Sequence, residues 1–156
     1  MDLMLFVAIG SLISLCFAGF LFNRVKSHSQ GTEKMIKISS AISKGADAYL
    51  KRQYKGVGVF FSAVFVVLLI LSFCGYLNHF VPFAFLTGGF FSALSGFIGM
   101  RTATMANART AFAAKEGLNK GLKVAFSAGA VMGFVVVGLV LLYLSIWYFF
   151  LKYCYT

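Results

Sequence analysis

The fold of this chain is decided by residues 56–100, GVGVFFSAVFVVLLILSFCGYLNHFVPFAFLTGGFFSALSGFIGM, which contain no Asp, Glu, Lys or Arg. An α-helix rises about 1.5 Å per residue and needs about 20 residues to cross a hydrocarbon core of about 30 Å. These 45 residues therefore suit two membrane spans. The natural break lies at Tyr76 to Pro82, where Asn78, His79 and the chain's only proline supply turn chemistry that the flanking segments lack.

Two further charge-free segments flank this stretch, Leu3 to Phe22 and Val124 to Leu151, and each suits one span. Hydrophobic residues make up 60% of the chain and charged residues 12%, whereas soluble domains carry about a quarter charged residues. A cleaved signal peptide is not expected at the first span, because its basic cluster follows the apolar run. We predict an all-α polytopic membrane protein with four spans, at about residues 3–22, 57–77, 81–100 and 120–151.

Basic residues are concentrated in two of the three connections between the predicted spans. Eight Lys or Arg lie between the first and second spans and five between the third and fourth, which leaves only Lys152 on the other side. Because cytoplasmic loops carry such an excess, both basic connections are predicted to be cytoplasmic, with Asn78 and both termini, Thr156 included, outside. Anionic lipids of the inner leaflet then account for the net charge of +10, and no nucleic-acid partner is expected.

The connection between the first two predicted spans has the pattern of an amphipathic helix. Between Thr32 and Lys55, polar residues recur at intervals of three and four, and the opposite face is apolar. Thr32 is the expected N-cap. Two placements fit: a helix lying in the headgroup layer, or a helix that runs on into the second span and docks on its neighbours. The second is favoured because Ala41, Gly45 and Ala48 permit close approach.

The connection between the last two predicted spans also favours helix. Six alanines and no glycine or proline occur between Arg101 and Ala114, so the third helix is expected to continue past the membrane surface. Gly117 is predicted to end it and Asn119 to cap the fourth helix. The chain is then expected to form two helical hairpins of one design, with helical extensions in the cytoplasm.

Small residues spaced by four predict close helix–helix packing in three of the spans. The rows are Gly10, Ser14 and Ala18 in the first span, Gly88, Ser92 and Gly96 in the third, and Ala125, Gly129 and Gly133 in the fourth. The second span has no such row. It is therefore expected to be the most lipid-exposed of the four.

The chemistry-bearing residues are few and scattered. Glu33, Asp47 and Glu116 are the acids expected on the cytoplasmic side, whereas a magnesium-dependent phosphate site needs clustered carboxylates. The charge-free segments at residues 3–22, 56–100 and 124–151 contain no Asp, Glu, Lys or Arg of the kind that marks an ion path. The three cysteines have no paired spacing typical of a metal or redox motif. We therefore predict no catalytic, cofactor-binding or metal-binding residue in this chain.

Three segments make the sequence recognisable. They are GADAYLKRQY at residues 45–54, SALSGFIGMRTATMANARTA at residues 92–111 and AFSAGAVMG at residues 125–133. In order and spacing they closely resemble the N-terminal region of membrane-bound, ion-translocating inorganic pyrophosphatases. The similarity covers about Ser11 to Ser145.

The resemblance implies a homodimeric pump with many more helices, which hydrolyses cytoplasmic pyrophosphate with Mg²⁺, and in some members K⁺, and exports protons or sodium ions. Its catalytic groups lie later in the chain, so the resemblance assigns no active-site residue here. Tyr49, Arg52, Arg101 and Arg109 are expected to be structural contacts to the remaining helices. The membrane is expected to be a bacterial cell membrane.

Two main interpretations remain open at this point. The chain is the N-terminal portion of such a pump, as a truncated product, a fragment or half of a split protein, or it is a stand-alone structural or assembly membrane protein. A small channel of another class is disfavoured by the spans' lack of ionisable groups.

Overall fold

The computed structural model describes residues 3–155, which form four long α-helices. Their bounds are α1 Leu3–Lys26, α2 Glu33–Phe73, α3 Phe80–Glu116 and α4 Leu118–Tyr155. Each is long and apolar enough to cross a membrane, which confirms the all-α class and the four candidate spans. The predicted outer positions of Met1 and Thr156 lie outside the described residues.

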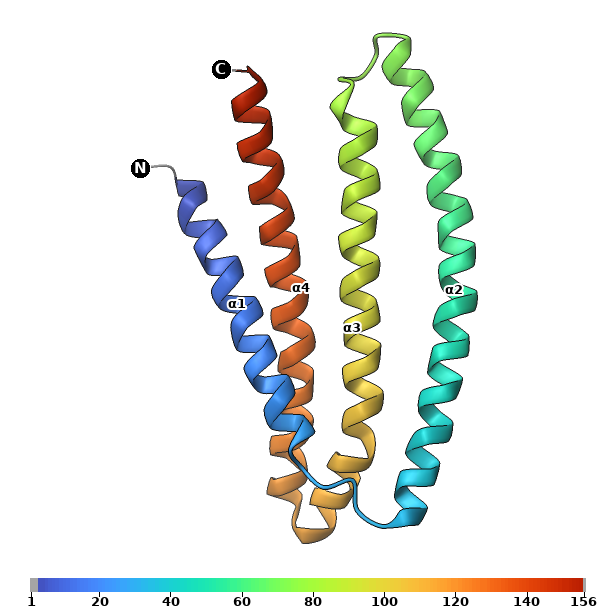
Figure 1. Ribbon diagram of the computed structural model, residues 1–156, viewed down its shortest axis with the longest axis vertical. Helices are drawn as coiled ribbons and strands as arrows, with labels where there is room; N and C mark the ends of the chain where they lie inside the picture. The colour runs from blue at the N-terminus through green and yellow to red at the C-terminus, as the bar shows by residue number, and fades with distance from the viewer. Residues whose placement is uncertain (1–2, 156) are drawn as a thin grey trace.

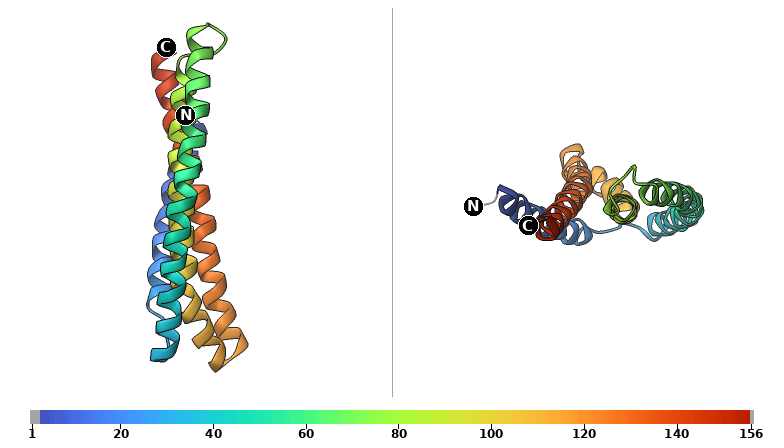
Figure 2. Two further views of the ribbon diagram at one scale, coloured as in Figure 1. Left: turned by 90° about the vertical axis from the view of Figure 1, so that its right-hand side faces the viewer. Right: turned by 90° about the horizontal axis from the view of Figure 1, so that it is seen from above.

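The helices lie side by side in the order α1, α4, α3, α2 (Figures 1 and 2). The most extensive helix contacts are those of α4 with α1 and with α3. The α2 helix packs on α3, and α1 has only a small contact with α3. No contact joins α1 to α2 within residues 3–155. The expected hairpin of the first two helices is therefore wrong: the connection at residues 27–32 crosses to the far side of α3, and α1 instead packs on α4.

The α2 helix is continuous from Glu33 to Phe73, so the amphipathic segment runs on into the second span instead of lying apart from it. At about 1.5 Å per residue its 41 residues extend about 60 Å, twice the thickness of a hydrocarbon core. Thr32 occupies the N-cap position, but its side chain makes no capping hydrogen bond. Of the four spans, α2 has the smallest buried share, in line with the expected exposure of this helix.

The α2 helix ends at Phe73, four residues before the predicted end of the second span at residue 77, because a Schellman motif ends it. Gly75 adopts the left-handed conformation with φ +81°. Its N–H donates to the Ser72 carbonyl oxygen, and the Tyr76 N–H donates to that of Leu71. Pro82, predicted to belong to the turn, is buried in the first turn of α3, where a missing N–H costs no helical hydrogen bond.

The turn between α3 and α4 is a single residue. Gly117 ends α3 with φ +150°, a value that favours glycine, and this part of the prediction is confirmed. Asn119 is not the cap, because α4 already begins at Leu118 and the Gly117 carbonyl oxygen accepts the first hydrogen bonds of α4, from the N–H groups of Lys120 and Gly121. A Cβ on Gly121 would lie 2.8 Å from that of Ala114, so this crossing needs glycine.

The α1–α4 interface contains the main hydrophobic core, which is made by Ala18, Leu21, Val131, Val135 and Leu139. The Ser14 hydroxyl donates to the Phe134 carbonyl oxygen across this interface at 2.9 Å. A Cβ on Gly138 would lie 2.7 Å from Leu15 Cγ, so glycine sets the closest approach here. Ser14 and Ala18 thus confirm part of the predicted small-residue row of the first span, whereas Gly10 faces open space.

The small-residue row of the fourth span does not face another helix of this chain. Ala125, Gly129 and Gly133 are exposed, and a Cβ on either glycine would meet no atom within 4 Å. The packed face of α4 instead runs through Val124, Ala128, Val131, Val135 and Leu139. Successive residues turn by about 100° around a helix, so Ala125, Gly129 and Gly133, which are one or two positions away from the packed residues, lie well to the side of that face.

Candidate functional site

Both short connections, residues 27–32 and Gly117, lie at the same end of the molecule, opposite the α2–α3 turn (Figure 1). We call this the basic end, defined by residues 24–55 and 101–123, which hold thirteen of the fourteen basic residues. The segments 45–54 and 92–111, singled out by sequence, lie largely within it or next to it.

Arg109 of α3 fixes the end of α1. Its Nε donates to the carbonyl oxygens of His28 at 3.0 Å and Lys26 at 3.3 Å, and its Nη1 donates to that of Met105 at 2.7 Å. The carbonyl groups at a helix C-terminus carry partial negative charge and favour a cation. Burial lowers the pKa of the guanidinium from its ordinary value, yet an arginine remains charged in proteins. Arg109 is thus a buried structural cation.

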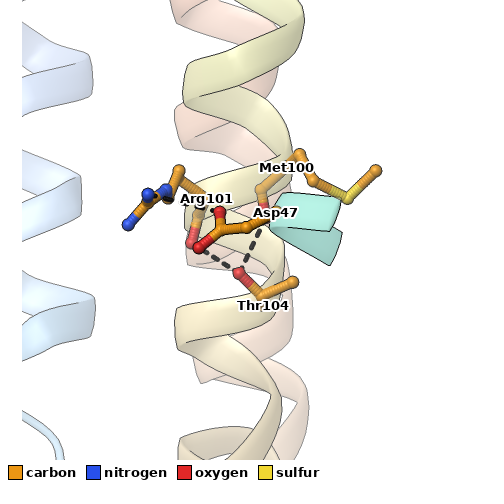
Figure 3. A network of polar contacts seen from close by, with 4 residues as sticks. All are labelled: Asp47, Met100, Arg101 and Thr104. Carbon is orange, nitrogen blue, oxygen red and sulfur yellow. Dashed lines mark hydrogen bonds and ion pairs between the residues drawn. The ribbon is translucent and has the colours of Figure 1, made fainter. Parts of the chain in front are cut away.

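Asp47 of α2 and Arg101 of α3 form an ion pair, with Oδ1 and Nη2 3.2 Å apart (Figure 3). The guanidinium also lies over the Phe97 ring, 5.3 Å from its centroid. Both charged side chains are about half exposed, and such a pair contributes about 0 to 1 kcal/mol. The pair joins α2 to α3 at the basic end.

Two tyrosines hydrogen-bond to backbone carbonyl groups of α3. The Tyr54 hydroxyl of α2 donates to the Ala93 oxygen at 2.6 Å, and the Tyr143 hydroxyl of α4 donates to the Ala84 oxygen at 2.7 Å. Each ring lies beside a glycine of the row predicted in the third span. A Cβ would lie 3.4 Å from the Tyr54 hydroxyl at Gly96 and 3.2 Å from the Tyr143 hydroxyl at Gly88. Both glycines are confirmed as packing positions, while Ser92 is exposed.

Tyr49 and Arg52 are exposed, and they line a shallow groove with Gln53, Gly56 and Val57. The described part of the chain gives neither side chain a hydrogen bond or an ion pair. Of the four residues expected to make structural contacts, the structure therefore places Arg101 and Arg109 in contacts within this chain. The expectation for Tyr49 and Arg52 concerns other helices and stays a prediction.

The acidic residues do not gather. Asp47 pairs with Arg101, Glu116 pairs with Lys120 at 2.9 Å, and Glu33 lies in the first turn of α2. Among residues 3–155, no group of three or more His, Cys, Asp or Glu is placed to hold a metal ion. The donor set therefore does not fit the several Mg²⁺ ions of a pyrophosphate site, and no metal-dependent step is assigned to these residues.

Four long apolar helices with a strongly basic end define a polytopic α-helical membrane segment. The sequence profile of the family described as "Inorganic H+ pyrophosphatase" matches residues 12–155. The chain belongs to this family of membrane pyrophosphatases.

Among its relatives is a protein of Bacteroides thetaiotaomicron, 53% identical over 97% of this chain and described as "Putative K(+)-stimulated pyrophosphate-energized sodium pump". Two others are described as "K(+)-insensitive pyrophosphate-energized proton pump". The Methanosarcina mazei protein is 42% identical over 91% of the chain, and the Streptomyces coelicolor protein is 37% identical over 87%. The chain spans about a fifth of the length of these relatives, at 21%, 21% and 19%.

Proposed function

We propose that this chain is the N-terminal four-helix part of a pyrophosphate-energised ion pump and supplies outer helices that brace a catalytic core. The observation that carries the proposal is the family match over residues 12–155, in a segment whose described acids do not gather into a metal site. The catalytic groups then belong to helices beyond those described. The pump as a whole would couple hydrolysis of cytoplasmic pyrophosphate, with Mg²⁺, to export of protons or sodium ions.

In this proposal the basic end is cytoplasmic and the α2–α3 turn lies outside, in a bacterial cell membrane. The basic asymmetry between the connections supports this orientation. The lengths of α2, α3 and α4, which are 41, 37 and 38 residues, support helical extensions, since about 20 residues suffice for a span. Tyr49 and Arg52 are then free to contact later helices of the pump, which would act as a homodimer.

A chimera tests the proposal. The matching segment of the Bacteroides thetaiotaomicron relative, which is 53% identical, is replaced by this chain, and pyrophosphate hydrolysis and ion uptake are measured in inverted membrane vesicles. We expect the chimera to retain both activities at levels comparable to the parent. A chimera that reaches the membrane, folds and remains inactive would instead favour a stand-alone structural or assembly protein.

The isolated chain gives the complementary result. Purified in detergent with Mg²⁺ and K⁺, it is expected to release no phosphate from pyrophosphate above a control from membranes with empty vector. Phosphate release that disappears on mutation of Asp47 or Glu116 would contradict a purely structural role. Sequencing the DNA beyond the codon for Thr156 separates the two interpretations most cheaply, because further helices with clustered aspartates would indicate a pump.

A further inference from the structure

A groove between α1 and α4 at the basic end carries two positive charges without a carboxylate partner. It has a volume of about 580 Å³, and it is lined by Arg24, Asn119, Leu122, Lys123, Phe126 and Ser127. Within residues 3–155, neither Arg24 nor Lys123 forms an ion pair. The acid nearest to Lys123 in sequence, Glu116, is already paired with Lys120. The groove therefore presents net positive charge from two different helices.

The groove lies at the boundary of two spans. The charge-free segment of α1 ends at Phe22, two residues before Arg24, and that of α4 begins at Val124, directly after Lys123. Because both side chains line one groove, the two boundaries lie at the same depth. On the proposed placement of these helices in a membrane, on which this inference rests, that depth is the layer of lipid headgroups.

We propose that this groove binds an anionic phospholipid through its phosphate group. Arg24 and Lys123 would face the phosphate, and the Asn119 amide offers a further donor. The Ser127 hydroxyl already donates to the Lys123 carbonyl oxygen at 2.8 Å, so its oxygen is left to accept from a headgroup hydroxyl. Two positive charges suit a headgroup with net negative charge better than a zwitterionic headgroup, in which a cation of the lipid already neutralises the phosphate.

The apolar lining favours a lipid over a free phosphate ion. Leu122 is 44% exposed and Phe126 is 74% exposed, and both lie along the groove on α4. Phe126 follows Lys123 on the membrane side of this boundary, so an acyl chain that leaves the headgroup towards the membrane would cover its side chain and remove that surface from contact with water. A free anion would contact only the charged groups of Arg24 and Lys123 and would leave the Phe126 side chain exposed to water.

Native mass spectrometry of the purified chain tests the proposal, with phosphatidylglycerol and phosphatidylcholine as probes. We expect phosphatidylglycerol to be retained in preference. The variant Arg24→Gln/Lys123→Gln should weaken its binding by about tenfold to thirtyfold, since each basic residue near an anionic lipid contributes about fivefold. The matched control is Lys51→Gln/Lys55→Gln, which removes the same charge from α2 next to its own span boundary at Gly56.

Several results decide the outcome. Equal loss of binding in both double variants would show diffuse surface charge and overturn the site. Displacement of the lipid by equimolar inorganic phosphate would show a free-anion site and also overturn it. Phe126→Ala gives a second test if the double variant fails to fold, because this side chain makes few packing contacts. Unchanged retention of phosphatidylglycerol by the Phe126→Ala variant would contradict the proposed contact with an acyl chain. Because none of these readouts needs pump activity, they are independent of the chimera.

Discussion

The Nε of Arg109 donates to the carbonyl oxygen of His28 at 3.0 Å, across 81 positions of the sequence. This contact, with the companion bond to Lys26, holds the start of the α1–α2 connection against α3. The connection itself contains few apolar residues that could hold it in place. Arg109 therefore fixes the point from which α2 begins on the far side of α3.

Replacing Arg109 by lysine is expected to destabilise the chain by about 1 to 3 kcal/mol. A lysine ammonium cannot reproduce the planar fork that reaches carbonyl groups of α1 and of α3 together, and it would leave buried acceptors unpaired. Thermal unfolding in detergent measures the loss. Arg52→Lys, at an exposed position, is the control, and equal effects at the two positions would refute the anchoring role.

Gly138→Ala is expected to destabilise the α1–α4 interface by about 1 to 3 kcal/mol as an overpacking change. The added Cβ would lie 2.7 Å from Leu15 Cγ and 3.2 Å from the Ser11 carbonyl oxygen. Gly133→Ala should be neutral or stabilise by up to about 1 kcal/mol, because alanine favours helix and its Cβ meets open space. The reverse order of the two unfolding temperatures would place the interface on the other face of α4.

Tyr54→Phe and Tyr143→Phe are each expected to cost about 0.6 to 1.5 kcal/mol through loss of one hydrogen bond to α3. The two bonds join different helix pairs at different heights, so the double variant should show the sum of the single effects. Tyr76→Phe is the matched control, since that side chain is 80% exposed. If all three single variants have the same free energy of unfolding, these hydrogen bonds do not stabilise the packing of α3.

Cysteine labelling in intact cells tests the orientation. In a background with Cys16, Cys74 and Cys154 replaced by serine, Asn78→Cys should react with an impermeant thiol reagent, whereas Ser40→Cys and Asn107→Cys should not. The expectation rests on the excess of basic residues in two connections. Strong labelling of Asn107→Cys with none at Asn78→Cys would invert the topology.

The spans were predictable because the thickness of the hydrocarbon core sets a minimum length for every helix that crosses it. The charge-free segments of the sequence have this length, or twice this length. The stop at Gly117 was predictable from local propensity. The continuous α2 was the favoured of two placements, but the reason given for it does not hold, because Ala41, Gly45 and Ala48 are exposed. Thr32 and Asn119 show the limit of such reasoning. Their side chains suit a cap, but the neighbouring backbone determines where each helix begins.

Helix partners were not predictable in the same way. The row at Gly129 and Gly133 has the spacing of an interface, yet α4 packs through the adjacent face, where Val131 and Val135 meet α1. Both faces of α4 have the spacing of a packing surface, and only the three-dimensional arrangement shows which of them contacts α1. Arg101 and Arg109 were expected to make structural contacts, but their partners, Asp47 and the carbonyl oxygens of Lys26 and His28, were not predicted, because each contact joins segments that are distant in the chain.

The pairing of α1 with α4 has a consequence for the order of assembly. About 90 residues separate the end of α1 at Lys26 from the start of α4 at Leu118. At about 5 to 20 residues per second, a ribosome needs roughly 5 to 20 s to make them. During that time α1 is already synthesised and has no native partner for Ser14. Nascent α1 must therefore be sheltered by the insertion machinery or by lipid until the last helix arrives.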